Sequence, residues 1–352
     1  MGFNLKNRRY FGAKTKLLDN IENVINDNIK KDNLSLIDVF GGTGVVGGHF
    51  IQKDNFKSLL INDFLYSNYI VFKAFFESKD FDKEKLEKIV EHFNSKTDLQ
   101  ENYYGIEFGD RYFSKRDATL IGYIRDTIDI LLEKEKINES ERNILLASLL
   151  FSCDKIANTA GHYDGFRKGV KIEDKFIYSL IDPLNLENKN VKSIQKDANE
   201  LAKLLVENNY RFDIAFLDPP YNSRQYSRYY HFQDTLIKGD KPELFGVARK
   251  PKESQKSAYC FKNASLAFKD LINNLSKTCD NIIVTYNNTV ESASKPNTMS
   301  LEQIKEILSS YGELKTYEFD FKVYNSGKTD VENTFNNHKE IVLLLKVNLS
   351  NL

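Results

Sequence analysis

The chain has 352 residues, 41% hydrophobic and 28% charged, and its formal net charge is zero. This composition is typical of a folded globular protein, and the neutral balance argues against a protein that coats nucleic acid through bulk charge. No apolar run approaches the roughly 18 residues that a membrane helix needs. The first residues also lack the apolar core of a signal peptide, so we expect a cytoplasmic protein without a membrane partner.

The first predicted elements are a helix, a strand and a tight turn into a second helix. Apolar residues at helical spacing predict a helix over 15–31, with Thr15 as its cap. Residues 34–40 are typical of a buried strand, and Thr43 opens the next helix. A second strand is expected over 56–64.

A long middle region interrupts this alternation. The pattern from 66 to 158 is mostly helical, and residues 157–171 form a loop of small and polar residues. The region is too long for a simple crossover between strands. We therefore expect an inserted helical and loop region over 65–190, with one α/β domain built from 1–64 and 191–352.

The last third of the chain returns to strands. A short strand is expected over 191–197, and a strongly apolar one over 212–222 stops at two prolines. Another strand follows over 279–288, and the segments 314–324 and 338–346 are expected to close the sheet as an antiparallel pair. The predicted fold is α/β, with a mostly parallel Rossmann-like sheet and a C-terminal antiparallel hairpin.

The turn after the first strand has a G-x-G-x-x-G pattern over 42–47, and Asp63 follows about twenty residues later. Glycines allow a ligand to approach the backbone, and an acid at that distance can bind ribose hydroxyls. The pattern suits a nicotinamide dinucleotide and S-adenosylmethionine equally well. A tight turn without any ligand is the structural alternative.

The end of the third apolar strand is more specific. Asp218, Pro219, Pro220 and Tyr221 place an acid, two prolines and an aromatic ring at the mouth of that strand. The prolines fix the backbone and remove two N–H donors, which leaves the Asp218 carboxylate and a prolyl carbonyl as acceptors. This pair can hold both hydrogens of an amine, and Tyr221 offers a face for stacking. The set suits an adenine presented out of its duplex.

With these motifs in view, the chain resembles a DNA adenine-N6 methyltransferase of the Dam-like D12 class found in restriction–modification systems. Residues 7–18 are similar to that class's opening motif, 38–47 to its cofactor motif, 61–63 to its second-strand acid and 218–221 to its catalytic motif. The order of the motifs also matches. Ala13 departs from the class, where a second glycine is common.

The resemblance implies a class I methyltransferase fold, S-adenosylmethionine as cofactor and no metal. It implies this cofactor-binding set: Tyr10, Lys14, Asp38, Phe40, Gly41, Gly42, Gly44, Asp63, Asp197 and Asp218. Tyr10, Lys14 and the glycine turn would contact the methionine end. Asp63 would hold the ribose and Asp197 the cofactor adenine.

The resemblance assigns the chemistry to Asp218, Pro219, Pro220 and Tyr221. The acid and the first proline would orient the target amine, and the tyrosine would stack on the base. Duplex DNA is the implied partner, together with a functional partnership with a restriction endonuclease without a stable complex. Expected DNA contacts are Arg224, Gln225, Tyr226, His162, Tyr163 and Arg167. Packing of these loops around the site is the alternative for all six residues.

Other functions stay open from the sequence alone. An RNA adenine, a cytosine N4 or a glutamine methyltransferase can also use an acid or Asn followed by two prolines and an aromatic residue. An NAD-dependent oxidoreductase would explain the glycine turn but gives no reason for the motif at 218–221. A DNA-binding module with an adenosine pocket would bind the cofactor without turnover.

Overall fold

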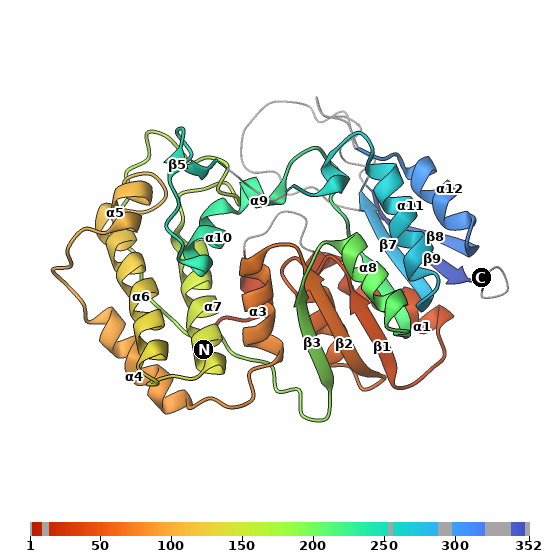
Figure 1. The fold of residues 1–352 in the computed structure, drawn as a ribbon, viewed down its shortest axis with the longest axis horizontal. Helices are drawn as coiled ribbons and strands as arrows, with labels where there is room; N and C mark the ends of the chain where they lie inside the picture. The colour runs from red at the N-terminus through yellow and green to blue at the C-terminus, as the bar shows by residue number, and fades with distance from the viewer. Residues whose placement is uncertain (1, 9–13, 253–255, 288–297, 321–338, 349–352) are drawn as a thin grey trace.

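The computed structural model describes residues 2–8, 14–252, 256–287, 298–320 and 339–348. One side of the molecule is built on a seven-stranded sheet in the order β3-β2-β1-β4-β7-β9-β8, and a group of helices lies beside it (Figure 1). Its strands are β1 Leu34–Asp38, β2 Phe56–Asp63, β3 Asn190–Gln195, β4 Phe212–Leu217, β7 Cys279–Asn287, β8 Gly312–Asp320 and β9 Lys339–Val347.

The first five strands of this order pair in parallel, and β9 runs antiparallel to both β7 and β8. The predicted mostly parallel sheet with a C-terminal antiparallel hairpin is confirmed. The central strand β4 is covered on both faces, which explains its continuous apolar run from Ile214 to Leu217. The edge strand β8 is largely exposed and correspondingly rich in polar residues.

Helices cover both faces of the sheet. On one face lie α1 Leu18–Asn28, α2 Val45–Ile51 and α3 Tyr66–Phe76, and on the other lie α8 Ala198–Glu207, α11 Ala264–Leu275 and α12 Leu301–Ser309. Alternate residues of a strand enter opposite cores, as Ile214 and Ala215 do in β4. The three cysteines, Cys153, Cys260 and Cys279, are free and buried.

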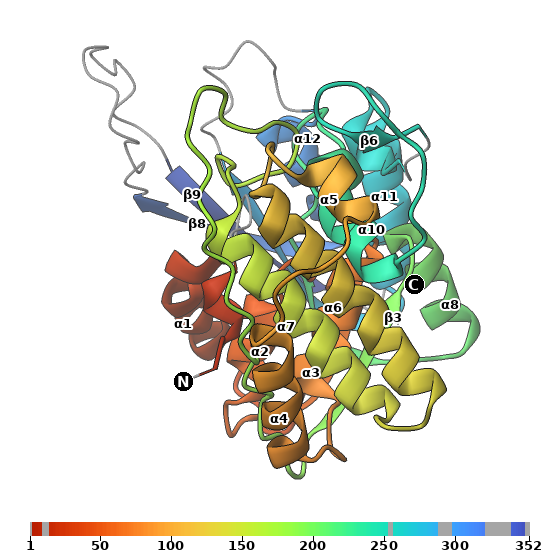
Figure 2. The same cartoon turned by 90° about the vertical axis from the view of Figure 1, so that its left-hand side faces the viewer.

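A helical region follows α3, composed of α4 Lys83–Asn94, α5 Tyr103–Phe108, α6 Lys115–Glu133 and α7 Glu139–Ile156. Its buried side chains belong to the same core as α1, α2 and α3. The first helix of the predicted insertion, α3, covers β2 and β3, while α10 His231–Lys238, beyond the insertion, packs on α3, α6 and α7 (Figure 2). The helical region and the sheet therefore share one continuous core.

Local corrections concern the ends of elements. The helix expected over 15–31 begins at Leu18 with Leu17 at its N-cap, and Thr15 lies in a preceding 3-10 turn, Lys14–Lys16. The remaining short elements are 3-10 turns at Leu5–Asn7 and Ala258–Cys260, helix α9 Tyr226–Tyr229, and the strand pair β5 Leu244–Phe245 and β6 Lys250–Pro251. Within the described ranges, no helix is both long and apolar enough to cross a membrane.

A buried polar network joins the N-terminal segment to the helical region. The fully buried Arg8 donates to Asn68 of α3 and to Gln233 of α10, both at 2.6 Å, and its Nε lies 3.8 Å from Asp154 of α7. Gln233 and the Tyr163 hydroxyl both donate to Asp154 Oδ1. One guanidinium thus connects three helices and the loop that carries Tyr163.

Replacing Arg8 by methionine should lower the free energy of unfolding by about 3 kcal/mol, because it removes the cation that faces the buried Asp154 carboxylate. Urea unfolding measures this change. Arg211→Met is the matched control, since Arg211 is half exposed and pairs with Asp280 at the surface. Its effect should stay within about 0.5 kcal/mol. Equal stabilities of the two variants would show that the network contributes little.

Candidate active site

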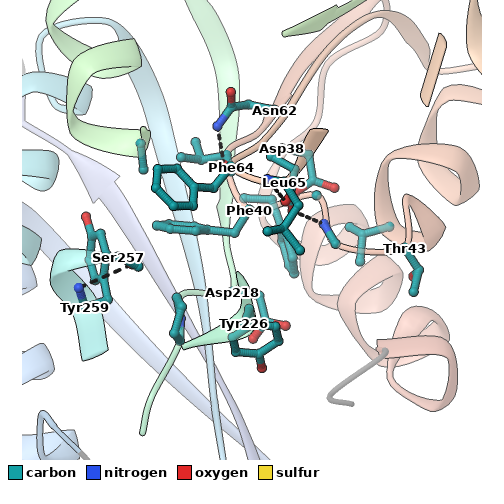
Figure 3. Close-up of a pocket in the computed structure, with 18 of the residues that line it drawn as sticks. Asp38, Phe40, Thr43, Asn62, Phe64, Leu65, Asp218, Tyr226, Ser257 and Tyr259 are labelled. Carbon is teal, nitrogen blue, oxygen red and sulfur yellow. Dashed lines mark hydrogen bonds between the residues drawn. The ribbon is translucent and has the colours of Figure 1, made fainter. Parts of the chain in front are cut away.

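A cavity opens where the sheet presents the carboxyl ends of its parallel strands, and it measures about 920 Å³ including its mouth. The ends of β1, β2 and β4 meet there, as expected for an open α/β sheet (Figure 3). The residues of the predicted cofactor set that line it are Lys14, Asp38, Phe40, Gly41, Gly42, Asp63, Asp197 and Asp218. Tyr10, the remaining aromatic of that set, lies outside the described residues.

The glycine turn after β1 adopts a backbone that side chains tolerate poorly. Gly42 and Gly44 have φ values of +53° and +80°, and a Cβ on Gly41 would come within 2.8 Å of Ile61 and Phe72. Gly44 forms the N-cap of α2 and does not itself line the cavity. Gly47 lies in α2 and packs on Leu59 and Ile61 of β2.

Asp38, the last residue of β1, is 1% exposed. Its Oδ2 accepts a hydrogen bond from the Gly47 N–H at 3.2 Å, while its Oδ1 has no partner in the described part of the chain. Burial, reinforced by the nearby charges of Asp218 and Asp63, raises the pKa of Asp38 to about 8. The cavity therefore contains a buried carboxyl oxygen that can take a donor.

Asp63 and Asn62 end β2 and organise the neighbouring strand ends. Asp63 accepts from the N–H groups of Gly42 and Leu65, both at 2.8 Å, and burial raises its pKa to about 6 against these hydrogen bonds. The Asn62 amide donates to the carbonyls of Val39 and Lys196 and accepts from the Lys196 N–H. These bonds fix the cavity floor.

Asp197 lies at the start of α8, where it caps the helix. Its Oδ1 accepts from the N–H groups of Asn199 and Glu200, and the residue lines the cavity at its β3 side. A carboxylate is favoured at this position because it complements the unpaired N–H groups of the first turn. The cap leaves Oδ2 for a donor inside the cavity.

Lys14, Thr285 and Tyr221 all lie within hydrogen-bond distance of one oxygen of Asp218, and the single proton of the Tyr221 hydroxyl is shared between this oxygen and the Thr285 carbonyl. Lys14 Nζ lies 3.1 Å from Oδ1, the Tyr221 hydroxyl 2.9 Å and the Thr285 hydroxyl 2.8 Å. The Lys14 ammonium is buried, which opposes its charge, but Asp218 and Glu340 outweigh this effect and raise its pKa. Oδ1 is thereby saturated, and Oδ2 is the Asp218 oxygen to which no described residue donates.

Pro219, Pro220 and Tyr221 complete the motif that begins at Asp218. Pro220 lines the cavity and Pro219 is buried behind it. The Tyr221 hydroxyl also bonds to the Thr285 carbonyl, and its ring meets Tyr286 edge-on at 5.2 Å. The hydroxyl thus anchors the tyrosine to the sheet, and the ring stays half-buried.

Two predicted DNA-contacting residues face the cavity. Gln225 and Tyr226 both line it, and the Gln225 amide exchanges two hydrogen bonds with the backbone of Ser257. The predicted DNA contact of the Tyr163 side chain is wrong, because this side chain is buried. It is 2% exposed, and its hydroxyl donates a hydrogen bond to Asp154. Its aromatic ring belongs in the core because it packs on Phe232.

The other predicted DNA contacts lie at the surface. His162 stacks on Tyr229 with ring centroids 4.7 Å apart, and the exposed Arg224 lies 5.6 Å from the same ring. Burial, against the opposing field of Asp164, lowers the pKa of His162. Arg167 is exposed on the same loop as His162. Tyr229 thus joins the two segments from which DNA contacts were predicted.

Several cavity residues were missed from the sequence. Phe64 and Leu65 follow Asp63 directly, and Ser257 and Tyr259 come from a segment without a motif. Tyr259 meets Phe40 edge-on at 5.2 Å and donates to Asn199. Thr285 had a usable signal, because a polar residue near the end of the strand next to β4 reaches the same sheet edge as Asp218.

Comparison with known proteins identifies the family of the chain. Residues 10–319 match the family model "D12 class N6 adenine-specific DNA methyltransferase". The chain is 34% identical over 327 residues to the type II methyltransferase M.FokI of Planomicrobium okeanokoites, covering 88% of this chain and 48% of that protein. It is 30% identical over 339 residues to M.NlaIII of Neisseria lactamica, covering 92% of this chain and 94% of that protein. The chain thus spans about half of the first relative and nearly all of the second.

The buried Asp38 predicts a pH dependence of stability. Its folded-state pKa of about 8 lies above the unfolded value of about 4, so the folded state binds the proton more tightly. This contribution is complete below the unfolded pKa and is lost as pH rises towards 8. The melting temperature of the ligand-free protein should therefore fall more between pH 5 and 8.5 than that of Asp38→Asn. Parallel profiles would contradict the raised pKa.

Proposed function

The chain belongs to the D12 class of N6 adenine-specific DNA methyltransferases, and we propose that it transfers a methyl group from S-adenosylmethionine to the N6 amine of an adenine rotated out of duplex DNA. The observation that carries this proposal is the state of Asp218. Lys14 and the Thr285 hydroxyl donate to its Oδ1 at the mouth of the cavity, which leaves Oδ2 for an incoming N–H group.

The cavity's donor set fits the cofactor. S-adenosylmethionine, when bound, supplies an electrophilic methyl group on a sulfonium. The unpartnered Asp38 Oδ1 suits the cationic methionine amine, and Asp63 is oriented for the ribose hydroxyls. Phe40 and Tyr259 provide aromatic surface, and Asp197 Oδ2 suits the adenine amine. An acid-lined cavity is suitable for a cofactor with two positive charges.

The chain's own part in the reaction is orientation and electrostatics. The lone pair of an adenine amine is delocalised into the ring, which makes the nitrogen a poor nucleophile. Hydrogen bonds from its two N–H groups to Asp218 Oδ2 and the Pro219 carbonyl favour a more tetrahedral nitrogen. Lys14 holds the carboxylate in position through an ion pair at 3.1 Å. Asp218 then accepts the N6 proton, which becomes acidic once the methyl group has been transferred.

The DNA surface is proposed to lie around Tyr229. Arg224 and Arg167 are exposed and can contact phosphates, while His162 can approach a base edge. Gln225 and Tyr226 instead shape the pocket for the flipped base, since both line the cavity beside Asp218. Tyr221 offers the partly exposed ring for stacking on that base.

The biological role follows from the relatives. The proteins to which the chain is similar are named as type II methyltransferases. We infer that this chain likewise protects DNA, in the cytoplasm, from a cognate restriction endonuclease without forming a stable complex with it. Detection of N6-methyladenine in DNA from expressing cells would reveal the modified base and its sequence context.

Asp218→Asn should reduce methyl transfer to duplex DNA by at least about a thousandfold, because the amide presents donors where an acceptor is needed. Cofactor affinity, measured by calorimetry, should change little. Asp280→Asn is the control. Asp280 is half exposed and lies at the start of β7, at the sheet edge opposite Asp218. Substantial activity of Asp218→Asn would overturn the assignment. Parallel assays on RNA and on cytosine-only duplexes separate the alternative substrates.

Arg224→Ala should weaken binding of duplex DNA several-fold and reduce the slope of log affinity against log salt by about 1. The cation contacts phosphate in this proposal, so cofactor affinity should be unchanged. Arg211→Ala serves as control because Arg211 precedes β4, at the sheet edge opposite Asp218. The same loss in both variants would mean that the effect is not local to the proposed surface.

A further inference from the structure

A third charged group faces the catalytic pair from the last strand. Glu340 lies at the beginning of β9, and its register partner is Asn287 at the end of β7. Because β7 is parallel to β4, its end lies at the same sheet edge as Asp218. Glu340 is beyond residues 10–319, the part of the chain that matches the family model.

The carboxylate of Glu340 is buried and only half satisfied. The residue is 7% exposed, and its Oε1 accepts from the Asn287 amide at 2.6 Å. Its Oε2 has no hydrogen-bond partner in the part of the chain that the structure describes. A buried carboxylate of this kind needs a compensating charge nearby.

Lys14 is the nearby cation. It forms an ion pair with Asp218 at 3.1 Å, and its field and the Asn287 hydrogen bond oppose the rise in the pKa of Glu340 that burial and the charge of Asp218 cause. Glu340 in turn contributes to the raised pKa of Lys14. The ammonium therefore contacts Asp218 and acts on Glu340 through its field.

We propose that Glu340 is an electrostatic residue of the methyl-transfer centre, whose carboxylate adds a negative charge to the group formed by Lys14, Asp218 and Glu340. This inference rests on the proposed function. During the reaction, positive charge moves onto N6 beside Asp218. Lys14 and Asp218 alone form a neutral pair, which offers little stabilisation to that charge. Glu340 restores a negative potential without touching the substrate.

The first test is Glu340→Gln, which keeps the shape and removes the charge. The single-turnover rate should fall roughly tenfold, because a nearby charge in a buried site changes the barrier by about 1.4 kcal/mol. The affinities for cofactor and duplex DNA should stay within about twofold. Glu318→Gln is the matched control, since Glu318 is half exposed on the neighbouring strand and pairs with Lys339. Glu340→Met takes the place of Glu340→Gln if that variant does not fold.

A further variant distinguishes charge from packing. Glu340→Asp keeps the charge and should retain clearly more activity than Glu340→Gln. Equal losses in the Asp and Gln variants would overturn the role.

The test of Glu340 can be distinguished from the test of the proposed function. A wild-type protein that transfers no methyl group to adenine in any duplex would refute the proposed function itself. An active wild-type protein whose rate is unchanged by Glu340→Gln would refute only the role of Glu340.

Discussion

The ion pair between the buried Lys14 and the partly exposed Asp218 is the interaction on which the site depends. It joins a residue near the N-terminus to the end of the central strand β4, so the N-terminal segment must lie across the carboxyl edge of the sheet before the site is complete. The pair also determines the chemistry of Asp218. Lys14 and Thr285 donate to one oxygen, and the other oxygen keeps its acceptor capacity. In the proposed reaction, a carboxylate held in this way first orients the amine and takes its proton only after the methyl group has been transferred.

The second constraint is the accumulation of acids at one sheet edge. Asp38 and Asp63 are both buried beside Asp218, and burial raises the pKa of each. Backbone N–H groups compensate Asp63 on both oxygens but Asp38 on only one. A protein selected for stability alone would not leave such a carboxyl oxygen without a donor. The arrangement is consistent with a cationic ligand. Its binding would supply the donor that the Asp38 carboxyl lacks and would thereby stabilise the fold.

The sequence predicted what depends on strand patterning and on the chemistry of strand ends. The apolar run of β4 indicated a central strand, and parallel pairing then required Asp38, Asp63 and Asp218 to meet at one edge. The direction in which loop side chains point was less predictable. Tyr163 stands among polar residues, yet packing on Phe232 and a hydrogen bond to Asp154 hold it in the core. Glu340 carried no signal, because only the antiparallel register of β9 brings it to the site.

The placement of the helical region bears on how DNA recognition is connected to catalysis. An insertion with its own core could move relative to the sheet, but here the helices share one core with α1, α2 and α3. The Arg8 network strengthens that connection, since Asp154 accepts from both Gln233 of α10 and Tyr163 of the loop that presents His162. The surface around Tyr229 is therefore connected to the sheet through packed and hydrogen-bonded side chains. If this surface binds DNA as proposed, specificity would reside in its exposed side chains, and changes in the shared core would alter recognition and catalysis together.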